Sequence, residues 1–265
     1  ARRWDASMSE LLFEYIKYFR WKMYMPEFQT EDTKQRLDYF YQQVVHSLLL
    51  MATGQVLQKD GGNPSGSPNT TYDNNIGHIL VKSYSFFLDL PEKEPLDFLT
   101  EVFSAMYADD YLDAMTADVA GRWTHQSATK GYADWGITLK SDHKESDTLN
   151  GLTFLGSQFQ YHSQDGWVPV FPVDRALCAI RWNPRQNGCY DDLILAESIY
   201  REAFYTSERK FFREWMQHCR DRVLADVSHR KSLDNCPIRL RGQIISLIHE
   251  LPSERAVSRG YTGYE

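Results

Sequence analysis

The sequence has few cysteines, no long apolar run and no excess of basic residues. Among its 265 residues are four cysteines, without a C-x-x-C pair or a zinc-type spacing, which indicates free thiols in a reducing compartment. No apolar run reaches the roughly 18 residues of a transmembrane helix, so no direct membrane segment is predicted. The 29 Lys and Arg against 36 Asp and Glu give a net charge of −7. This argues against a uniformly basic nucleic-acid-binding surface, but a basic channel inside an acidic shell is compatible with it.

The chain is rich enough in apolar residues to build a packed core, with 42% hydrophobic and 14% aromatic residues. Up to Pro172 helical and strand patterns alternate, and after it the pattern is almost entirely helical. An α+β region followed by an α-helical region is therefore expected. Helices are predicted at residues 9–24, from about residue 32, at 67–88 and at 113–129, and in the third of these Ser67 is the N-cap and Pro68 the first helical residue. Hairpins are predicted with turns at Thr53-Gly54, Asp109-Asp110 and Asp165-Gly166. A strand is predicted to run from Trp135 into a charged loop.

The stretch "MYADDYL" places Asp109 and Asp110 at the tip of an apolar hairpin. Two like charges about 4 Å apart repel by roughly 4 kcal/mol at an effective dielectric constant of about 20. The simplest interpretation is a solvated turn, because Asp favours turns. The alternative is a metal site, because a divalent cation such as Mg²⁺ binds carboxylates together with substrate phosphates and would cancel the repulsion.

A glycine-rich stretch, "GGNPSGSPNTTYDNN", leads into a predicted helix. Glycines let the backbone bend sharply and approach a ligand, and the helix start directs its N–H groups toward the loop. Thr70 and Asn74 are four residues apart and so share one helix face, where they can line a polar surface together with Ser65. A well-capped helix after a loop is the plainer interpretation.

Two further charged residues have simple structural explanations when each is taken alone. Asp5, in "RWDASMS", precedes a helix and could cap it, as Ser7 could. Lys144, in "KSDHKESD", could be a solvated charge.

The order of these motifs resembles the palm of RNA-dependent RNA polymerases of positive-strand RNA viruses. "WDASM" looks like the end of motif A, and Ser65, Gly66, Thr70 and Asn74 match the motif B pattern SGxxxTxxxN. "YADD" stands where the family usually has YGDD, "WGITLKSDHK" resembles motif D, and "LTFLGSQF" resembles motif E. The picornavirus-like supergroup fits best, and the "TGQVLQKDGGNPSG" and "GLTFLG" stretches are most similar to astrovirus-type polymerases.

The resemblance implies a right-hand polymerase palm, an antiparallel sheet with flanking helices, followed by an α-helical thumb. The palm would span residues 1–172, with residues 20–60 leaning toward the fingers, and the thumb 173–265. Most of the fingers would be missing. The chain also begins without Met, one residue after the place where the family has its first motif A aspartate. We therefore expect a fragment that is inactive by itself.

For the site, the resemblance implies template-directed nucleotidyl transfer by a two-metal mechanism. Asp109 and Asp110 would bind Mg²⁺, with Mn²⁺ as the alternative. The nucleotide would be bound by a second group of residues that reads the ribose 2′-OH, namely Asp5, Ser65, Gly66, Thr70 and Asn74. Lys144 would be the general acid that protonates the departing pyrophosphate.

The partners implied are an RNA template with a primer or nascent strand, ribonucleoside triphosphates and other viral replication proteins. The implied location is the host cytoplasm, at membrane-associated replication complexes. Ala108 replaces the family's usual glycine, and "YADD" is also typical of reverse transcriptases. A reverse transcriptase-like polymerase is therefore the first alternative, although Pro64-Ser65-Gly66 differs from the Pro-Gln-Gly usual there. A non-catalytic polymerase-like RNA-binding scaffold is the second, and a metal-dependent hydrolase the third.

Overall fold

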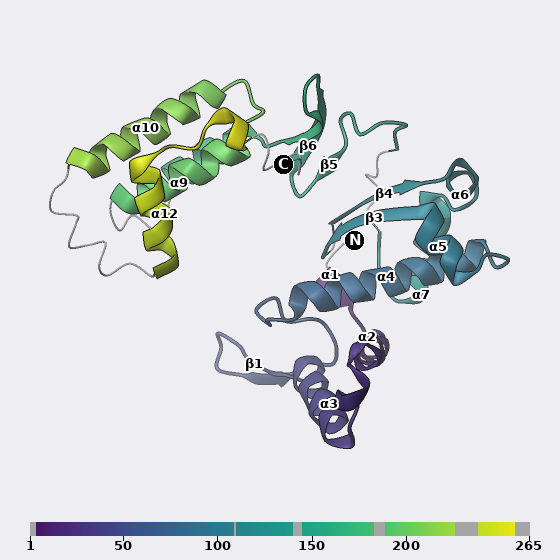
Figure 1. The fold of residues 1–265 in the computed structure, drawn as a ribbon. Helices are drawn as coiled ribbons and strands as arrows, with labels where there is room; N and C mark the ends of the chain where they lie inside the picture. Colours follow the sequence, from purple (N-terminus) through teal and green to yellow (C-terminus); the bar gives the residue numbers. More distant parts are fainter. Residues whose placement is uncertain (1–3, 109, 140–144, 183–188, 226–237, 258–265) are drawn as a thin grey trace. The chain divides into compact units, whose positions relative to one another are not determined.

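The computed structural model describes residues 4–108, 110–139, 145–182, 189–225 and 238–257 (Figure 1). The chain forms two units, Ala1–Lys144 and Glu145–Glu265. Small antiparallel sheets accompany many helices in the described residues, which agrees with the expected α+β region followed by helices. The assignment of 1–172 to a palm and 173–265 to a thumb stays a prediction.

The first unit begins with helices that the sequence predicts well. After the short α1 (Trp4–Ser7) come α2 (Glu10–Met23), a 3-10 turn (Pro26–Phe28) and α3 (Glu31–Val45). Ser9 accepts a hydrogen bond from the Leu12 N–H at 3.2 Å, so Ser9 caps α2. The predicted turn at Thr53-Gly54 is confirmed, because it joins strands β1 (Leu48–Leu50) and β2 (Val56–Gln58).

Helix α4 (Thr70–Asp89) is the central element of this unit (Figure 1). It begins later than predicted: Asn69 is its N-cap, and the Thr70 N–H bonds to the Ser67 carbonyl at 3.1 Å, so Ser67 and Pro68 belong to the preceding turn. Ile76, Leu80 and Phe87 on this helix are half-buried and pack against the apolar clusters of the unit. Its buried face carries Val81 and Phe86 together with a row of polar side chains, Thr70, Asp73, Asn74, His78, Lys82 and Ser85.

The acidic hairpin is present as predicted. Strands β3 (Val102–Tyr107) and β4 (Asp110–Met115) pair in antiparallel register, and Tyr107 lies opposite Asp110. The hairpin packs on one side of α4, whereas α2 lies on another (Figure 1). Side chains from α4, from the hairpin and from the helices beside them form one apolar cluster, Phe86, Leu90, Phe98, Val102, Val119 and Trp123.

Three predictions for the segments around the hairpin were wrong. The stretch "DLPEKEPLD", residues 89–97, has the composition of a connection, but its end begins α5 (Pro95–Glu101), which starts with a capping box between Glu94 and Asp97. The single helix expected from 113 to 129 is instead the end of β4, then α6 (Ala117–Arg122) and α7 (His125–Asp134). The Thr124 hydroxyl caps α7 by accepting from the Ser127 N–H, and this cap starts a new helix. Residues 135–139 form no strand.

The second unit contains a small sheet and a group of helices. Strands β5 (Thr153–Phe154), β6 (Ser157–His162) and β7 (Gly166–Val170) are antiparallel, with Gly166 opposite His162, so the hairpin predicted at Asp165-Gly166 is confirmed. Its described helices include α8 (Val173–Arg181), α9 (Cys189–Glu202), α10 (Arg209–Ala225) and α12 (Ile238–His249). They confirm the helical character predicted after Pro172, and their core includes Leu193, Tyr200, Phe212, Met216, Ile244 and Leu247.

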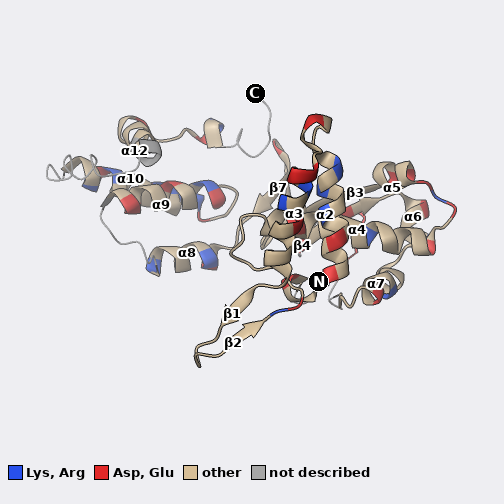
Figure 2. Cartoon of the chain, turned by 90° about the horizontal axis from the view of Figure 1, so that it is seen from below, with Lys and Arg blue, Asp and Glu red and all other residues tan. Residues whose placement is uncertain are grey.

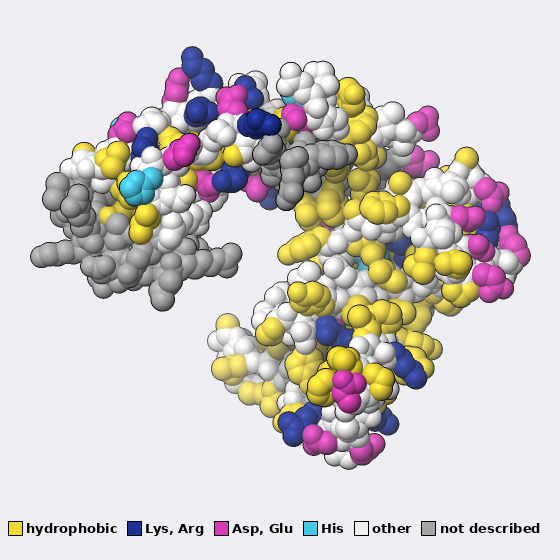
Figure 3. Space-filling model, viewed as in Figure 1, with side chains coloured by type: hydrophobic (Ala, Val, Ile, Leu, Met, Phe, Trp, Pro, Cys, Tyr) yellow, Lys and Arg dark blue, Asp and Glu magenta, His cyan; other side chains and the backbone are white. Residues whose placement is uncertain are grey.

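The described surface mixes charges of both signs and exposes many apolar side chains. Figure 2 shows acidic and basic residues interspersed along the helices of both units. Apolar side chains lie open on the face drawn in Figure 3. The β1–β2 hairpin is the clearest case, since Leu48 and Leu50 are 70% and 77% exposed. Among the described helices, none combines the length and apolarity needed to cross a bilayer.

Candidate nucleotide-binding site

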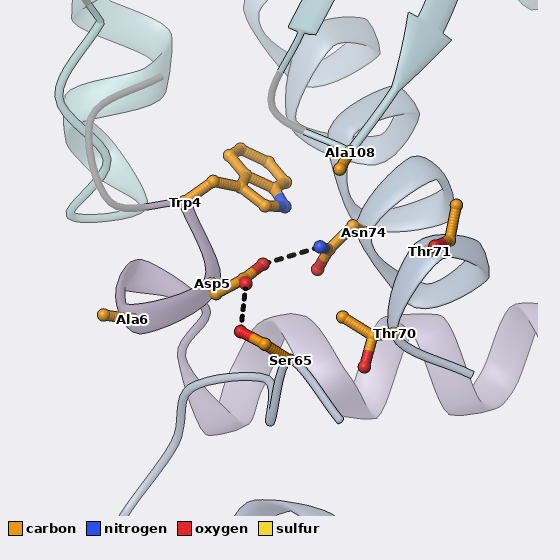
Figure 4. A pocket seen from close by; sticks show the side chains of 8 residues that line it. All are labelled: Trp4, Asp5, Ala6, Ser65, Thr70, Thr71, Asn74 and Ala108. Carbon is orange, nitrogen blue, oxygen red and sulfur yellow. Dashed lines mark hydrogen bonds between the residues drawn. The ribbon is translucent and has the colours of Figure 1, made fainter. Parts of the chain in front are cut away.

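An open pocket of about 350 Å³ lies where α1, the glycine-rich loop, α4 and the β3–β4 turn meet (Figure 4). Its lining comprises Trp4, Asp5, Ala6, Ser65, Thr70, Thr71, Asn74 and Ala108. Four of the five residues predicted to bind a nucleotide are therefore brought together here from segments about 60 residues apart in the sequence. Gly66, the fifth, follows Ser65 directly.

Asp5 is the centre of the hydrogen bonds in this pocket. Its Oδ2 accepts from the Ser65 hydroxyl at 2.9 Å and its Oδ1 accepts from the Asn74 side-chain amide at 2.6 Å (Figure 4). The capping role considered for this residue was wrong, because Ser9 is the residue that caps α2. A carboxylate has about four acceptor positions, so Asp5 retains capacity for a ligand hydroxyl while both of these bonds persist.

Two glycines bring the loop against α1. Gly61 and Gly62 have φ of +102° and +75°, a left-handed conformation that favours glycine. The Gly62 N–H bonds to the Met8 carbonyl at 2.7 Å, and the next N–H in the loop bonds to the Asp5 carbonyl at 2.7 Å. A Cβ on Gly61 would lie 3.0 Å from the Met8 carbonyl oxygen. The close backbone approach at this point is thus a contact with α1 and with Met8, which follows it.

Asn63 was not identified from the sequence, yet it orients Asn74. It is 6% exposed, and its Nδ2 donates to the Asn74 Oδ1 at 2.9 Å and to the Thr70 carbonyl at 3.2 Å. Because the Asn74 oxygen is engaged by this donor, the Asn74 NH₂ group is directed at Asp5. The available signal was a polar residue beside two glycines, which by itself is common in loops.

Thr70 and Ser65 have different positions in the site. The Thr70 hydroxyl lies within hydrogen-bonding distance of the Pro64 and Ser67 carbonyls, 2.9 Å from the latter, so it closes the loop onto the first turn of α4. Ser65 is exposed at the pocket, and its hydroxyl donates a hydrogen bond to Asp5. Gly66 has no positive φ, and a Cβ there would meet no atom within 4 Å.

Ala108 forms the side of the pocket that belongs to the acidic hairpin. Its φ is +56°, which is unusual for a residue with a Cβ and costs about 1–2 kcal/mol relative to glycine. Its N–H donates to the Asn75 Oδ1 at 2.8 Å, and its carbonyl lies 3.1 Å from the Nδ1 of His78. Neither of these α4 residues was predicted to belong to the site.

His78 is fully buried among aromatic rings. It stacks on Trp4 with ring centroids 4.7 Å apart and meets Tyr111 edge-on at 4.9 Å. Burial, aided by the positive charge of Lys82, lowers the pKa of His78 to about 3. The imidazole is therefore neutral near pH 7, and since a carbonyl only accepts, its Nδ1 carries the proton that is donated to Ala108.

One turn further along α4, Lys82 attaches to the middle of the hairpin. Its Nζ lies 2.6 Å from the Asp113 carboxylate and 3.2 Å from the Ser104 hydroxyl, and the ring of Tyr111 covers it at 4.3 Å. The side chain is 1% exposed, and burial lowers the pKa of Lys82 although Asp113 opposes this shift. Removing one partner of a buried pair leaves an uncompensated charge, so the pair fixes the hairpin on α4.

The proposed metal ligands are only partly within the described residues. Asp110 is the first residue of β4 and is exposed. It follows the pocket residue Ala108 by two positions in the sequence. Asp109 and Lys144 lie outside the described residues. Within the described ranges, no group of three or more His, Cys, Asp or Glu side chains could hold a metal ion. The chemistry of the one described ligand, a carboxylate, suits Mg²⁺.

The comparison with known families now identifies the class of protein. Residues 2–220 match the family model of viral RNA-dependent RNA polymerases, and the chain belongs to this family. The match includes all five motifs, and it agrees with the polymerase fold expected from them.

The relatives found among curated proteins include several astrovirus polyproteins. The chain is 28% identical over 180 residues to the non-structural polyprotein 1AB of ovine astrovirus 1, covering 66% of this chain and 13% of the relative. For the corresponding mink astrovirus 1 protein the identity is 31% over 163 residues, covering 58% and 11%. For human astrovirus-1 it is 24% over 230 residues, covering 83% and 15%. The predicted similarity to astrovirus-type polymerases is confirmed, and the chain spans a small part of these relatives' length.

Proposed function

We propose that this chain carries part of the active site of an RNA-directed RNA polymerase, which transfers ribonucleotides from triphosphates to an RNA 3′ end during viral genome replication and transcription. Family membership supports the reaction class. The observation that carries the proposal for this chain is the hydrogen-bonded group of Asp5, Ser65 and Asn74 in one pocket. Asp5 is 60 positions from Ser65 and 69 from Asn74 in the sequence, and a fold alone does not require that they meet.

In the proposal, this group reads the sugar of the incoming nucleotide. A 2′-OH both donates and accepts hydrogen bonds, and it can pair with the remaining acceptor capacity of Asp5 and with the exposed Ser65 hydroxyl. A deoxyribonucleotide offers no such group and leaves these polar atoms without the added partner. Discrimination then follows from the unmet hydrogen-bonding capacity of the site.

Asp109 and Asp110 would hold Mg²⁺, or Mn²⁺ in its place, beside this pocket. The metal ions would stabilise the attacking and leaving oxygens of an in-line displacement at the α-phosphate. The chain's own contribution is to place carboxylates next to the nucleotide, since Asp110 begins β4 two residues after the pocket residue Ala108. Lys144 would give a proton to the departing pyrophosphate.

The proposal extends to partners on the basis of the family. The ligands are an RNA template, a primer or nascent strand and ribonucleoside triphosphates. Other viral replication proteins would be partners, because the relatives are polyproteins. The proposed location is the host cytoplasm, at membrane-associated replication complexes.

The experiment is primer extension on an RNA template by a polymerase that contains this chain. Asp109→Asn keeps the side-chain volume but removes the charge that binds the metal, so extension with Mg²⁺ should disappear. Glu92→Gln, a carboxylate change at an exposed residue of the same unit, is the matched control and should extend normally. Extension by the Asp109→Asn protein at the control rate would exclude the metal role.

The same assay separates the main alternatives. A reverse transcriptase-like enzyme would extend with deoxyribonucleotides in preference to ribonucleotides. A non-catalytic scaffold would bind RNA without extension by any variant, including the unchanged protein.

A further inference from the structure

The peptide groups on both sides of Ala108 are held by side chains of one helix. Asn75 Oδ1 accepts the Ala108 N–H at 2.8 Å, and His78 donates from Nδ1 to the Ala108 carbonyl at 3.1 Å. These two α4 residues are three positions apart and therefore lie on one face of the helix. Ala108 directly precedes Asp109 and Asp110 in the sequence.

We propose that Asn75 and His78 are positioning residues for the acid pair, acting through the backbone of Ala108. The inference rests on the proposed function, since it assigns the way in which the carboxylates of that site are held. Neither residue needs to touch a nucleotide or a metal ion for this role.

The backbone conformation at Ala108 supports the proposal. A left-handed conformation at a residue with a Cβ persists only when its surroundings determine it. Here the two hydrogen bonds from α4 supply that constraint. Without them, the chain could relax toward an ordinary φ, which would redirect the start of β4 at Asp110.

The rigidity of His78 also supports it. The ring is enclosed by Trp4, Tyr111 and Tyr132, with centroid distances of 4.7, 4.9 and 5.8 Å. Trp4 precedes Asp5, and Tyr111 follows Asp110. The buried His78 ring thus contacts the sequence neighbours of both Asp5 and the acid pair. It thereby fixes the position of Asp5 relative to that of the acid pair.

The attachment of the hairpin to α4 does not depend on these two bonds alone. Lys82 binds Asp113 and Ser104 in the middle of the hairpin, and burying this pair supplies a separate anchor. Loss of the Asn75 and His78 bonds should therefore leave the hairpin in place but free its turn. Positioning and folding can be separated on this basis.

Two substitutions of His78 give opposite expectations for stability and for catalysis. His78→Phe keeps an aromatic ring against Trp4 and Tyr111 but cannot donate to the Ala108 carbonyl. His78→Asn loses the ring and leaves a cavity, but its amide nitrogen lies near the position of Nδ1 and can donate. The Phe variant should be the more stable protein and the Asn variant the more active one.

The assay is primer extension by a polymerase that contains this chain, with kcat, the KM for ribonucleotides and the Mg²⁺ concentration for half-maximal rate measured separately. His78→Phe and Asn75→Ala should lower kcat by about 10- to 100-fold and raise the Mg²⁺ requirement, with little change in KM. Amide hydrogen exchange should show lost protection of the Ala108 N–H in Asn75→Ala, which removes its acceptor, independently of activity.

The matched control replaces the separate anchor. In the double variant Lys82→Met and Asp113→Leu, both charges of the buried pair are removed together, so protection of Ala108 should be kept. If His78→Phe keeps the wild-type kcat and Mg²⁺ requirement, or if activity follows stability so that the Phe variant exceeds the Asn variant, the positioning role is wrong. Failure of the proposed function itself would give a different result, namely full extension by the Asp109→Asn protein.

Discussion

The Asn74 side chain donates to the Asp5 carboxylate across 2.6 Å, although 69 positions separate the two residues in the sequence. Asn63 fixes the direction of this bond by donating to the Asn74 oxygen at 2.9 Å. The chain Asn63–Asn74–Asp5 therefore presents one carboxylate to the pocket in a defined orientation. Its members come from the loop, from α4 and from α1.

The first prediction concerns sugar selection. In a polymerase that contains this chain, Asn74→Ala should lower the ratio of ribonucleotide to deoxyribonucleotide incorporation by about tenfold, because a hydrogen bond to a charged group contributes about 1.5–3 kcal/mol. Single-nucleotide incorporation kinetics measure this ratio. Tyr72→Phe, on an exposed part of the same helix, is the control and should leave the ratio unchanged. An Asn74→Ala protein with unaltered discrimination would remove this residue from the proposed role.

The second prediction concerns the different structural requirements for glycine at positions 61 and 66 of the loop. Gly66 has ordinary backbone angles and open space around its Cβ position, so Gly66→Ala should change the free energy of unfolding by less than about 1 kcal/mol. Gly61→Ala, at φ +102° and against the Met8 carbonyl, should destabilise the fold by about 1–3 kcal/mol. Chemical unfolding of the two variants tests the difference.

Gly66→Ala should affect nucleotide binding although it leaves the stability of the fold nearly unchanged. If the nucleotide approaches the loop at Gly66, the added methyl group raises the KM of a stable protein, since crowding costs about 1–3 kcal/mol. A Gly66→Ala protein that is both stable and kinetically normal would show that the ligand does not approach this position.

Much of this site could be predicted because its residues belong to local patterns. The hairpin alternation located Asp110, and the i, i+4 spacing placed Thr70 and Asn74 on one face of α4. The start of α4 was predicted too early because Ser67-Pro68 has the composition of a helix start but forms a turn. Sequence composition does not distinguish a helix start from a turn that is closed by a side chain such as that of Thr70.

The residues that were missed act through long-range contacts. His78 and Lys82 belong to a row of buried polar side chains on α4, and a periodicity analysis, which expects apolar residues at buried positions, does not select them. Their partners, the Ala108 carbonyl and Asp113, are 30 and 31 positions away in the sequence. Only the packing of the hairpin on α4 provides these partners, and only then is burial of the polar groups compensated.

The third prediction concerns the contact of α7 with α4. Gly131 lies in α7 so close to α4 that an added Cβ would be 2.6 Å from the Ser85 Cβ and 2.7 Å from its Cα. Gly131→Ala should therefore destabilise the first unit by about 1–3 kcal/mol, in spite of the higher helix propensity of alanine. Gly121→Ala, in α6 with no atom within 4 Å, should instead stabilise it by up to about 1 kcal/mol. A stable Gly131→Ala protein would contradict this packing.

The last prediction is a pH dependence that originates from His78. Its pKa is about 3 in the folded chain and near 6.5 when unfolded, so between these values the unfolded state binds a proton that the folded state does not. The contribution to stability is complete above pH 6.5 and is lost as the pH falls toward 3, by about 1.4 kcal/mol for each pH unit. At pH 5 the loss should be about 2 kcal/mol.

The two tyrosines that face this ring do not titrate in the same window. Burial raises the pKa of Tyr111 to about 12 and that of Tyr132 well above its usual value. Comparison with His78→Phe at each pH cancels the titration of groups that both proteins share, and hydrogen exchange of the α4 amides reports the free energy of opening for this unit. The stability of wild type relative to His78→Phe should therefore fall between pH 6.5 and 5. A difference that stays constant over this range would mean that His78 is protonated in the fold, and its Nε2 would then need a partner that accepts a hydrogen bond.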